Sequence, residues 1–264
     1  MADPFATAPA AVVFPLVAFA VILLAGRWLP LRGAIPAIAA TAGSLVVSLF
    51  VASEMLRGAG PHQETVYTYI GGVEGAGVTL DFGVLFDPLS VLMLVVVSLI
   101  AFLVSVFSLG YMNAEGERDL PRYYAGVSLF TFSMLAFVVS DSLLMAFVFF
   151  ELVGVCSYLL IGFWFREEGP ASAAKKAFLV TRFGDYFFLV GVVAVFALFG
   201  TTAFAGESSF VAQAADLAES GGEGAYTFLE LTNDQVILGT GLLVLGGVLG
   251  KSAQFPLQTW LPDA

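Results

Sequence analysis

The stretch that decides the fold is "AFVFFELVGVCSYLLIGFW", residues 146–164, which holds a single charged side chain. At a rise of about 1.5 Å per residue, such a helix approaches the roughly 20 residues needed to cross about 30 Å of hydrocarbon. The whole chain has this character: 59% of its residues are hydrophobic, 12% are charged, and the mean hydropathy is +0.94. Lipid offers no partners to backbone amides, and these runs are too long and too uniformly apolar for barrel strands. We therefore expect an all-α polytopic membrane protein.

Comparable apolar runs recur along the chain and predict about seven transmembrane helices. The runs cover residues 9–28, 34–53, 88–110, 121–140, 142–164, 176–199 and 236 to about 260. We expect the seventh helix to be interrupted near Lys251, because Gly250 precedes the lysine and Pro256 follows it. A proline lacks an N–H and clashes with the carbonyl four residues back, which frees carbonyls and side chains to order water. The alternative is a proline kink that serves only packing.

The segments between the runs predict little further structure. Residues 66–90, "VYTYIGGVEGAGVTLDFGVLFDPLS", alternate apolar and polar positions around "GGVEGAG" and predict a short β-hairpin on one membrane surface. Residues 200–235 are polar, Gly-rich and acidic, which indicates a surface loop with one short helix around 208–219. The first run lacks the basic region of a signal peptide, so we expect it to be a retained helix.

The basic residues predict the orientation in the membrane. The loops after the first, third and fifth runs carry Arg27, Arg32, Arg118, Arg122, Arg166, Lys175 and Lys176. The N-terminus and the other loops carry only Arg57. Cytoplasmic loops carry the excess of Lys and Arg, so we expect a multi-pass protein of the cell membrane with its N-terminus outside.

Four charged residues lie well inside the predicted spans, away from their ends, namely Glu151, Arg182, Asp185 and Lys251. A charge at that depth costs on the order of 2.5–3.5 kcal/mol, and such residues usually mark ion or proton pathways. Arg182 and Asp185 are three residues apart on one helix face, which also suits an ion pair that merely locks helices. Glu151 and Lys251 lie on different runs without a local partner, so we predict that they face each other as the pair that moves protons.

The pairing of Lys251 with an acid suggests how a proton is moved without a redox centre. Burial weakens a lysine's hold on its proton and a nearby carboxylate strengthens it, so displacement of the partner favours release. With one cysteine, Cys156, and one histidine, the chain cannot by itself build a haem or iron–sulfur site. It also lacks a Gly-rich phosphate loop. We expect no cofactor and no metal, and we interpret Cys156 as a small buried core residue.

Several of these stretches resemble a known family. They are "DFGVLFDPLS" (81–90), "GYMNAEGERDLPRYYAG" (110–126), "FFELVGVCSYLLIGFW" (149–164), "KAFLVTRFGDYFFL" (176–189) and "GKSAQFPLQTWLPDA" (250–264). From about residue 60 to the end, the chain is similar to the N-terminal half of subunit L of complex I-type NADH:quinone oxidoreductase. That subunit is antiporter-like and is related to the large subunit of Mrp antiporters.

The resemblance implies a role for each buried charge. Glu151 and Lys251 match the family's proton-translocation pair, and Arg182 and Asp185 match charges associated with coupling towards the neighbouring subunit. It further implies a translocase subunit without a redox centre of its own, in contact with other membrane subunits of a complex I-like assembly. Alternatives are an Mrp-type Na⁺/H⁺ antiporter subunit, with Na⁺ as the coupling ion, and a membrane subunit of an inorganic-carbon uptake system.

The resemblance also implies a division of the chain. Residues 1–110 are expected to hold the first three helices with the outside hairpin. Residues 111–264 are expected to hold helices four to seven of the family's inverted repeat, which is incomplete because the family continues beyond "LPDA". On this expectation the polypeptide does not pump protons by itself.

Overall fold

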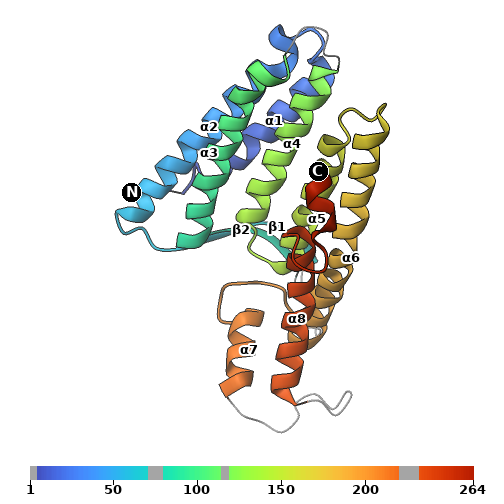
Figure 1. Ribbon diagram of the computed structural model, residues 1–264. Helices are drawn as coiled ribbons and strands as arrows, with labels where there is room; N and C mark the ends of the chain where they lie inside the picture. The colour runs from blue at the N-terminus through green and yellow to red at the C-terminus, as the bar shows by residue number, and fades with distance from the viewer. Residues whose placement is uncertain (1–4, 71–79, 114–118, 220–231) are drawn as a thin grey trace. The chain divides into compact units, whose positions relative to one another are not determined.

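The computed structural model describes residues 5–70, 80–113, 119–219 and 232–264 (Figure 1). These residues are mostly helical, with one two-stranded antiparallel sheet, which confirms the predicted fold class. The chain packs as two compact units. The first comprises residues 1–62, 85–139 and 152–166, and the second comprises residues 63–84, 140–151 and 167–264. Helix α5 (Leu143–Ile161) contributes its first half to the second unit and its second half to the first.

The first unit is a group of packed helices. Its elements are α1 (Pro9–Ala25), the 3-10 helix η1 (Pro30–Gly33), α2 (Ala34–Leu56), α3 (Pro88–Tyr111) and α4 (Leu120–Val138). Helix α1 packs against α2 and α4, and α3 packs against α2, as the blue and green ribbons of Figure 1 show. The core includes Ile22 of α1, Ala37 of α2 and Tyr124 of α4. Helix α3 begins where its sequence predicts, because Asp87 and Ser90 form a reciprocal capping box.

Small hydroxyl side chains line the contacts of α2 inside this unit. Thr41, Ser44 and Ser48 are all almost fully buried. The hydroxyl of Ser44 donates to the carbonyl of Ala11 on α1 at 2.7 Å, and that of Ser48 donates to the carbonyl of Ser44 at 2.7 Å. Small residues let membrane helices approach closely while their hydroxyls stay hydrogen-bonded. The unit therefore packs in the manner expected of helices in lipid.

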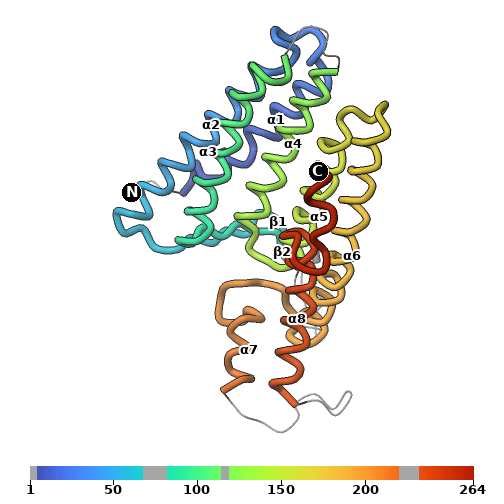
Figure 2. Tube along the Cα trace, in the orientation of Figure 1, coloured from blue at the N-terminus to red at the C-terminus, as the bar shows by residue number. Residues whose placement is uncertain are grey.

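The second unit contains the hairpin and the later helices. Its elements are most of β1 (His62–Ile70) and of β2 (Leu80–Phe86), followed by α6 (Glu168–Phe199), α7 (Phe210–Glu219), α8 (Asn233–Lys251) and the 3-10 helix η3 (Gln258–Asp263). Helix α8 runs along α6, and η3 also contacts α6, which the orange and red tubes of Figure 2 follow. Near the hairpin, the buried carboxylate of Asp141 accepts a hydrogen bond from the backbone N–H of Gly83 at 3.0 Å.

The helices agree with most of the predicted bounds. Five helical segments of the described residues are long and apolar enough to cross a membrane. They are residues 30–56, α3, α5, α6 and α8. Helix α1 is apolar but has 17 residues, so the predicted count of seven spans stays a prediction. The short helix predicted around 208–219 is confirmed as α7.

Two helix bounds differ from the predictions. Helix α6 begins at Glu168 instead of residue 176, because its first two turns are polar and an apolar run does not register them. Helix α8 ends at Lys251, where the interruption was expected, instead of continuing to about residue 260. The predicted turn at 71–77 and Arg118 lie outside the described residues, and the division of the chain at residue 110 stays a prediction.

Candidate functional site

The four charged residues predicted within the membrane lie on three helices of the second unit. Glu151 is in the middle of α5, Arg182 and Asp185 are one turn apart on α6, and Lys251 is the last residue of α8. Asp185 is the most buried, with 3% of its side chain exposed. Between 16% and 23% of the other three side chains is exposed.

These groups form one row of alternating charge. Glu151 is in an ion pair with Arg182, whose Nη1 also lies 3.7 Å from Oδ2 of Asp185. The same Asp185 oxygen lies 3.6 Å from Nζ of Lys251. Opposite charges thus follow one another from α5 through α6 to α8, and the row as a whole is neutral. Neutrality matters at this depth, because a buried charge is tolerated only when it is paired.

Both cations also bind the backbone of α5 at consecutive residues. Nη2 of Arg182 donates to the carbonyl of Glu151 at 3.3 Å, and Nζ of Lys251 donates to the carbonyl of Phe150 at 3.2 Å. The Lys251 ammonium lies 4.8 Å from the ring centroid of Phe150, within the range of a cation–π contact. Helix α5 therefore offers the Lys251 ammonium two uncharged contacts, a backbone carbonyl and an aromatic ring, which do not depend on its carboxylate partner.

The sequence predicted that Glu151 and Lys251 face each other as the pair that moves protons, but the ion pairs of the structure join each of them to α6 instead. Glu151 pairs with Arg182, and Lys251 pairs with Asp185. The reason is the spacing on α6: residues three apart share one helix face about 4.5 Å apart along the axis. Arg182 therefore meets α5, and Asp185 meets the end of α8. The predicted proximity of Arg182 and Asp185 is found, but each has a second partner on another helix.

Glycines bring α6 and α8 together beside the row. A Cβ on Gly184 would lie 3.0 Å from Cα of Gly250, and one on Gly250 would lie 3.3 Å from the carbonyl oxygen of Thr181. Both distances are shorter than most contacts of a real Cβ, so the two backbones lie in close contact where Asp185 and Lys251 follow their glycines. Small residues at such crossings allow close helix approach in membranes. This close approach sets the separation of the acid and the amine.

The end of α8 is closed by a Schellman motif immediately after Lys251. Ala253 has φ +51°, in the left-handed region. The N–H of Gln254 donates to the carbonyl of Leu249 at 3.0 Å, and the N–H of Ala253 donates to that of Gly250 at 3.4 Å. This is the bonding that ends many helices, although glycine is the usual residue at the left-handed position. The turn therefore fixes the point at which the lysine leaves the helix.

The predicted role of Pro256 therefore needs correction. The helix ends five residues before it, at Lys251, so the proline does not break a continuing helix. Nor are the terminal carbonyls free: that of Gly250 also accepts from Nε1 of Trp260 at 3.1 Å, and the hydroxyl of Ser252 donates to the carbonyl of Val248 at 2.5 Å. Gly250 is not a break in α8 but the point at which α8 contacts α6.

The Asp185 carboxylate is held by electrostatic attraction to two cations and not by hydrogen bonds. In the described part of the chain, neither of its carboxylate oxygens has a donor within hydrogen-bond distance. Two cations lie just beyond that distance, at 3.6 and 3.7 Å. Attraction between charges falls slowly with distance, so a carboxylate held in this way can strengthen its contact with either cation through a small movement.

Comparison with known proteins gives two family matches. Residues 140–264 match the family described as "NADH:quinone oxidoreductase/Mrp antiporter, TM". Residues 73–124 match the family described as "NADH-Ubiquinone oxidoreductase (complex I), chain 5 N-terminus". The first match contains all four residues of the charged row.

Curated relatives and solved structures agree with these matches. The chain is 38% identical to "F(420)H(2) dehydrogenase subunit L" of Methanosarcina mazei, over 95% of this chain and 36% of the relative. It is 35% identical to "NADH-quinone oxidoreductase subunit L" of Mycobacterium tuberculosis, over 96% of this chain and 37% of the relative. The chain therefore spans little more than a third of the length of these relatives.

Two solved structures share the fold. A chain of the archaeal membrane-bound sulfane sulfur reductase aligns with a TM-score of 0.74 at 17% identity, over 97% of this chain and 47% of that one. A chain of the Mrp complex from Dietzia sp. aligns with a TM-score of 0.73 at 23% identity, over 97% of this chain and 25% of that one.

Proposed function

Because the chain belongs to the family of antiporter-like membrane subunits that includes subunits L and 5 of NADH:quinone oxidoreductase, we propose that it takes part in proton translocation within a respiratory membrane complex. The observation that carries this proposal is the continuous row of Glu151, Arg182, Asp185 and Lys251 across three membrane-spanning helices. It acts as a translocase subunit without a redox centre, driven by partner subunits of the complex.

The geometry suggests how the row moves a proton. In the structure Arg182 is engaged mainly with Glu151, which leaves the charge of Asp185 available to hold the ammonium of Lys251. If Arg182 shifts towards Asp185, it neutralises that carboxylate, and the amine of Lys251 loses its counter-charge. The buried amine then releases its proton, because an unpaired charge in this environment is unfavourable. When Arg182 returns to Glu151, Lys251 takes up a new proton.

The row favours protons over sodium as the transported ion. A sodium ion needs several oxygen ligands, and both carboxylates of the row are already engaged with cations. The ammonium of Lys251 and the guanidinium of Arg182 would also repel a metal ion placed between them. A lysine, in contrast, carries a proton without any rearrangement of ligands.

The test replaces Lys251 in the assembled complex. Lys251→Met keeps the length of the side chain without its charge, and Lys251→Arg keeps the charge but cannot release a proton. We expect both variants to lower the number of protons pumped per electron transferred, measured in membrane vesicles with assembly checked on native gels. Lys175→Met, at an exposed position of α6, is the matched control. An unchanged ratio in an assembled Lys251→Arg complex would refute the proposal.

The location in the cell is part of the same proposal. Arg27, Arg32, Arg122 and Arg166 follow or precede helix ends on one side of the first unit, whereas Arg57 follows the other end of α2. This asymmetry supports a multi-pass protein of the cell membrane with its N-terminus outside. The helices from residue 111 onwards are proposed to form part of an inverted repeat.

A further inference from the structure

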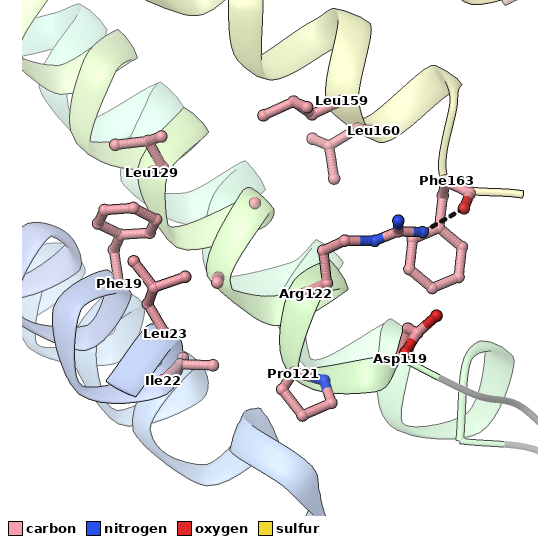
Figure 3. Close-up of a pocket in the computed structure, with 12 residues that line it drawn as sticks. Phe19, Ile22, Leu23, Asp119, Pro121, Arg122, Leu129, Leu159, Leu160 and Phe163 are labelled. Carbon is pink, nitrogen blue, oxygen red and sulfur yellow. Dashed lines mark hydrogen bonds between the residues drawn. The ribbon is translucent and has the colours of Figure 1, made fainter. Parts of the chain in front are cut away.

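The first unit contains an apolar groove that the proposed proton path does not use. It has a volume of about 460 Å³ and lies between α1, α4 and the second half of α5 (Figure 3). Its walls include Phe19 and Leu23 of α1, Leu129 of α4 and Leu160 of α5. Leu23 is 63% exposed at its edge, so the groove opens on the side of the helices that faces lipid. Its volume is within the range of about 300–1,000 Å³ that small-molecule sites occupy.

One end of the groove carries a positive charge. Arg122, in the first turn of α4, lines the groove and donates from its guanidinium to the carbonyl of Phe163 at the end of α5, the contact drawn in Figure 3. Its Cζ lies 4.7 Å from the ring centroid of Phe165, and that of Arg166 lies 5.7 Å from the same ring. Both guanidinium groups therefore contact one aromatic ring, and Arg122 is the one that lines the groove.

Further cations lie at the same end of the unit. The turn after α1 carries Arg27 and contacts the start of α4, since a Cβ on Gly26 would lie 2.8 Å from Cβ of Pro121. Asp119 is the acidic residue that lines this end of the groove among the described residues. Of the two charged residues that line the groove in the described part of the chain, Arg122 is the one that can bind an anion, and Arg27 lies on the neighbouring turn.

Exposed tryptophans mark the depth of this end in the membrane. Trp28 is 70% exposed and Trp164 is 40% exposed, on the segments that follow α1 and α5. Tryptophan is enriched at the level of the lipid headgroups, where its ring is partly in the apolar region and partly in water. The arginine end of the groove therefore lies at headgroup level, and its apolar length extends towards the acyl chains.

We propose that this groove binds an anionic phospholipid, with one acyl chain along α1, α4 and α5 and the phosphate at Arg122. Basic pockets between transmembrane helices recognise anionic headgroups in this way. An arginine binds phosphate through two parallel hydrogen bonds, and Arg122 keeps donors beyond the one that Phe163 accepts. The bound lipid would then stabilise the packing of the end of α5 against α4 and α1.

The test measures which lipid the full-length protein retains. The purified protein in detergent is incubated with equal amounts of phosphatidylglycerol and phosphatidylcholine, and native mass spectrometry counts each lipid that remains bound. We expect one phosphatidylglycerol to be retained at least tenfold over phosphatidylcholine. Arg122→Gln should reduce that preference several-fold, whereas Arg122→Lys should keep most of it because the charge remains.

Two further variants separate a built site from general attraction. Leu23→Trp fills the exposed edge of the groove without changing charge, and it should release the retained lipid even though Arg122 is intact. Arg57→Gln removes an exposed arginine at the other end of α2 and should change nothing. Equal retention of the two lipids by the unmodified protein would overturn the proposal. So would an equal loss of preference in Arg57→Gln and Arg122→Gln.

Discussion

Replacing Asp185 by Asn should impair proton translocation more than replacing Glu151 by Gln. Asn is nearly isosteric with Asp, so the 3.6 Å contact with Lys251 and the 3.7 Å contact with Arg182 lose the carboxylate charge with little change of shape. At 3.6 Å and an effective dielectric of about 20, the lost attraction to Lys251 is about 4–5 kcal/mol. About 1.4 kcal/mol corresponds to a tenfold change in an equilibrium constant, so a loss of this size is large enough to alter proton transfer at the row.

Part of this loss is recovered, because Lys251 also donates to the carbonyl of Phe150 and lies over its ring. We therefore expect the pumping rate of the Asp185→Asn complex to fall at least tenfold. The pumping rate of the Glu151→Gln complex should fall only a few-fold, because Glu151 acts on Lys251 through Arg182. The assay is acidification of vesicles containing the assembled complex, divided by the rate of electron transfer. Asp185→Glu, which keeps the charge, should restore most of the activity. A larger loss in Glu151→Gln than in Asp185→Asn would refute the pairing seen in the structure.

The remaining predictions concern the helix contacts that hold the row. Gly250→Val should force α8 away from Gly184 and lower the free energy of unfolding by about 1–3 kcal/mol, the usual cost of overpacking. Gly239→Ala on the same helix, where a Cβ meets no atom within 4 Å, should not destabilise, and equal losses in both variants would contradict the close contact. Ala253→Gly should raise the melting temperature, because alanine at φ +51° carries a penalty of about 1–2 kcal/mol that glycine lacks. A lower melting temperature would show that the left-handed turn is not formed.

The sequence was sufficient for the fold class because apolar length alone distinguishes membrane helices. The run that contains Glu151 predicted a span at 142–164, and α5 covers residues 143–161. The start of α6 was missed because a helix can extend beyond its apolar part into water. Hydropathy does not identify such a polar extension as helical. Glu168 begins that polar extension.

The four charged residues could be found from sequence, but their depth alone did not give their pairing. Depth along each helix follows from counting residues, whereas the direction in which a side chain points depends on how neighbouring helices rotate and pack. Glu151 and Lys251 were therefore placed at similar depth but given the wrong partners.

A signal for the correct contact was present in the sequence. Gly246 and Gly250 are four residues apart, a spacing typical of helices that approach closely in membranes. Gly184 directly precedes Asp185 on the helix that they contact. Read together, these glycines point to α6 as the neighbour of the end of α8, and so to Asp185 as the partner of Lys251.

The most direct test of this arrangement is a double-mutant cycle on the thermal stability of the assembled protein, with Asp185→Asn, Lys251→Met and both together. Each single variant leaves one buried charge without its partner, which typically costs about 3–5 kcal/mol, whereas the double variant removes both charges. We predict that the double variant is more stable than the sum of the single losses implies, by at least about 1 kcal/mol. The same cycle with Glu151→Gln in place of Asp185→Asn should be closer to additive. Additive losses for Asp185 and Lys251, with coupling between Glu151 and Lys251 instead, would contradict the charged row described here.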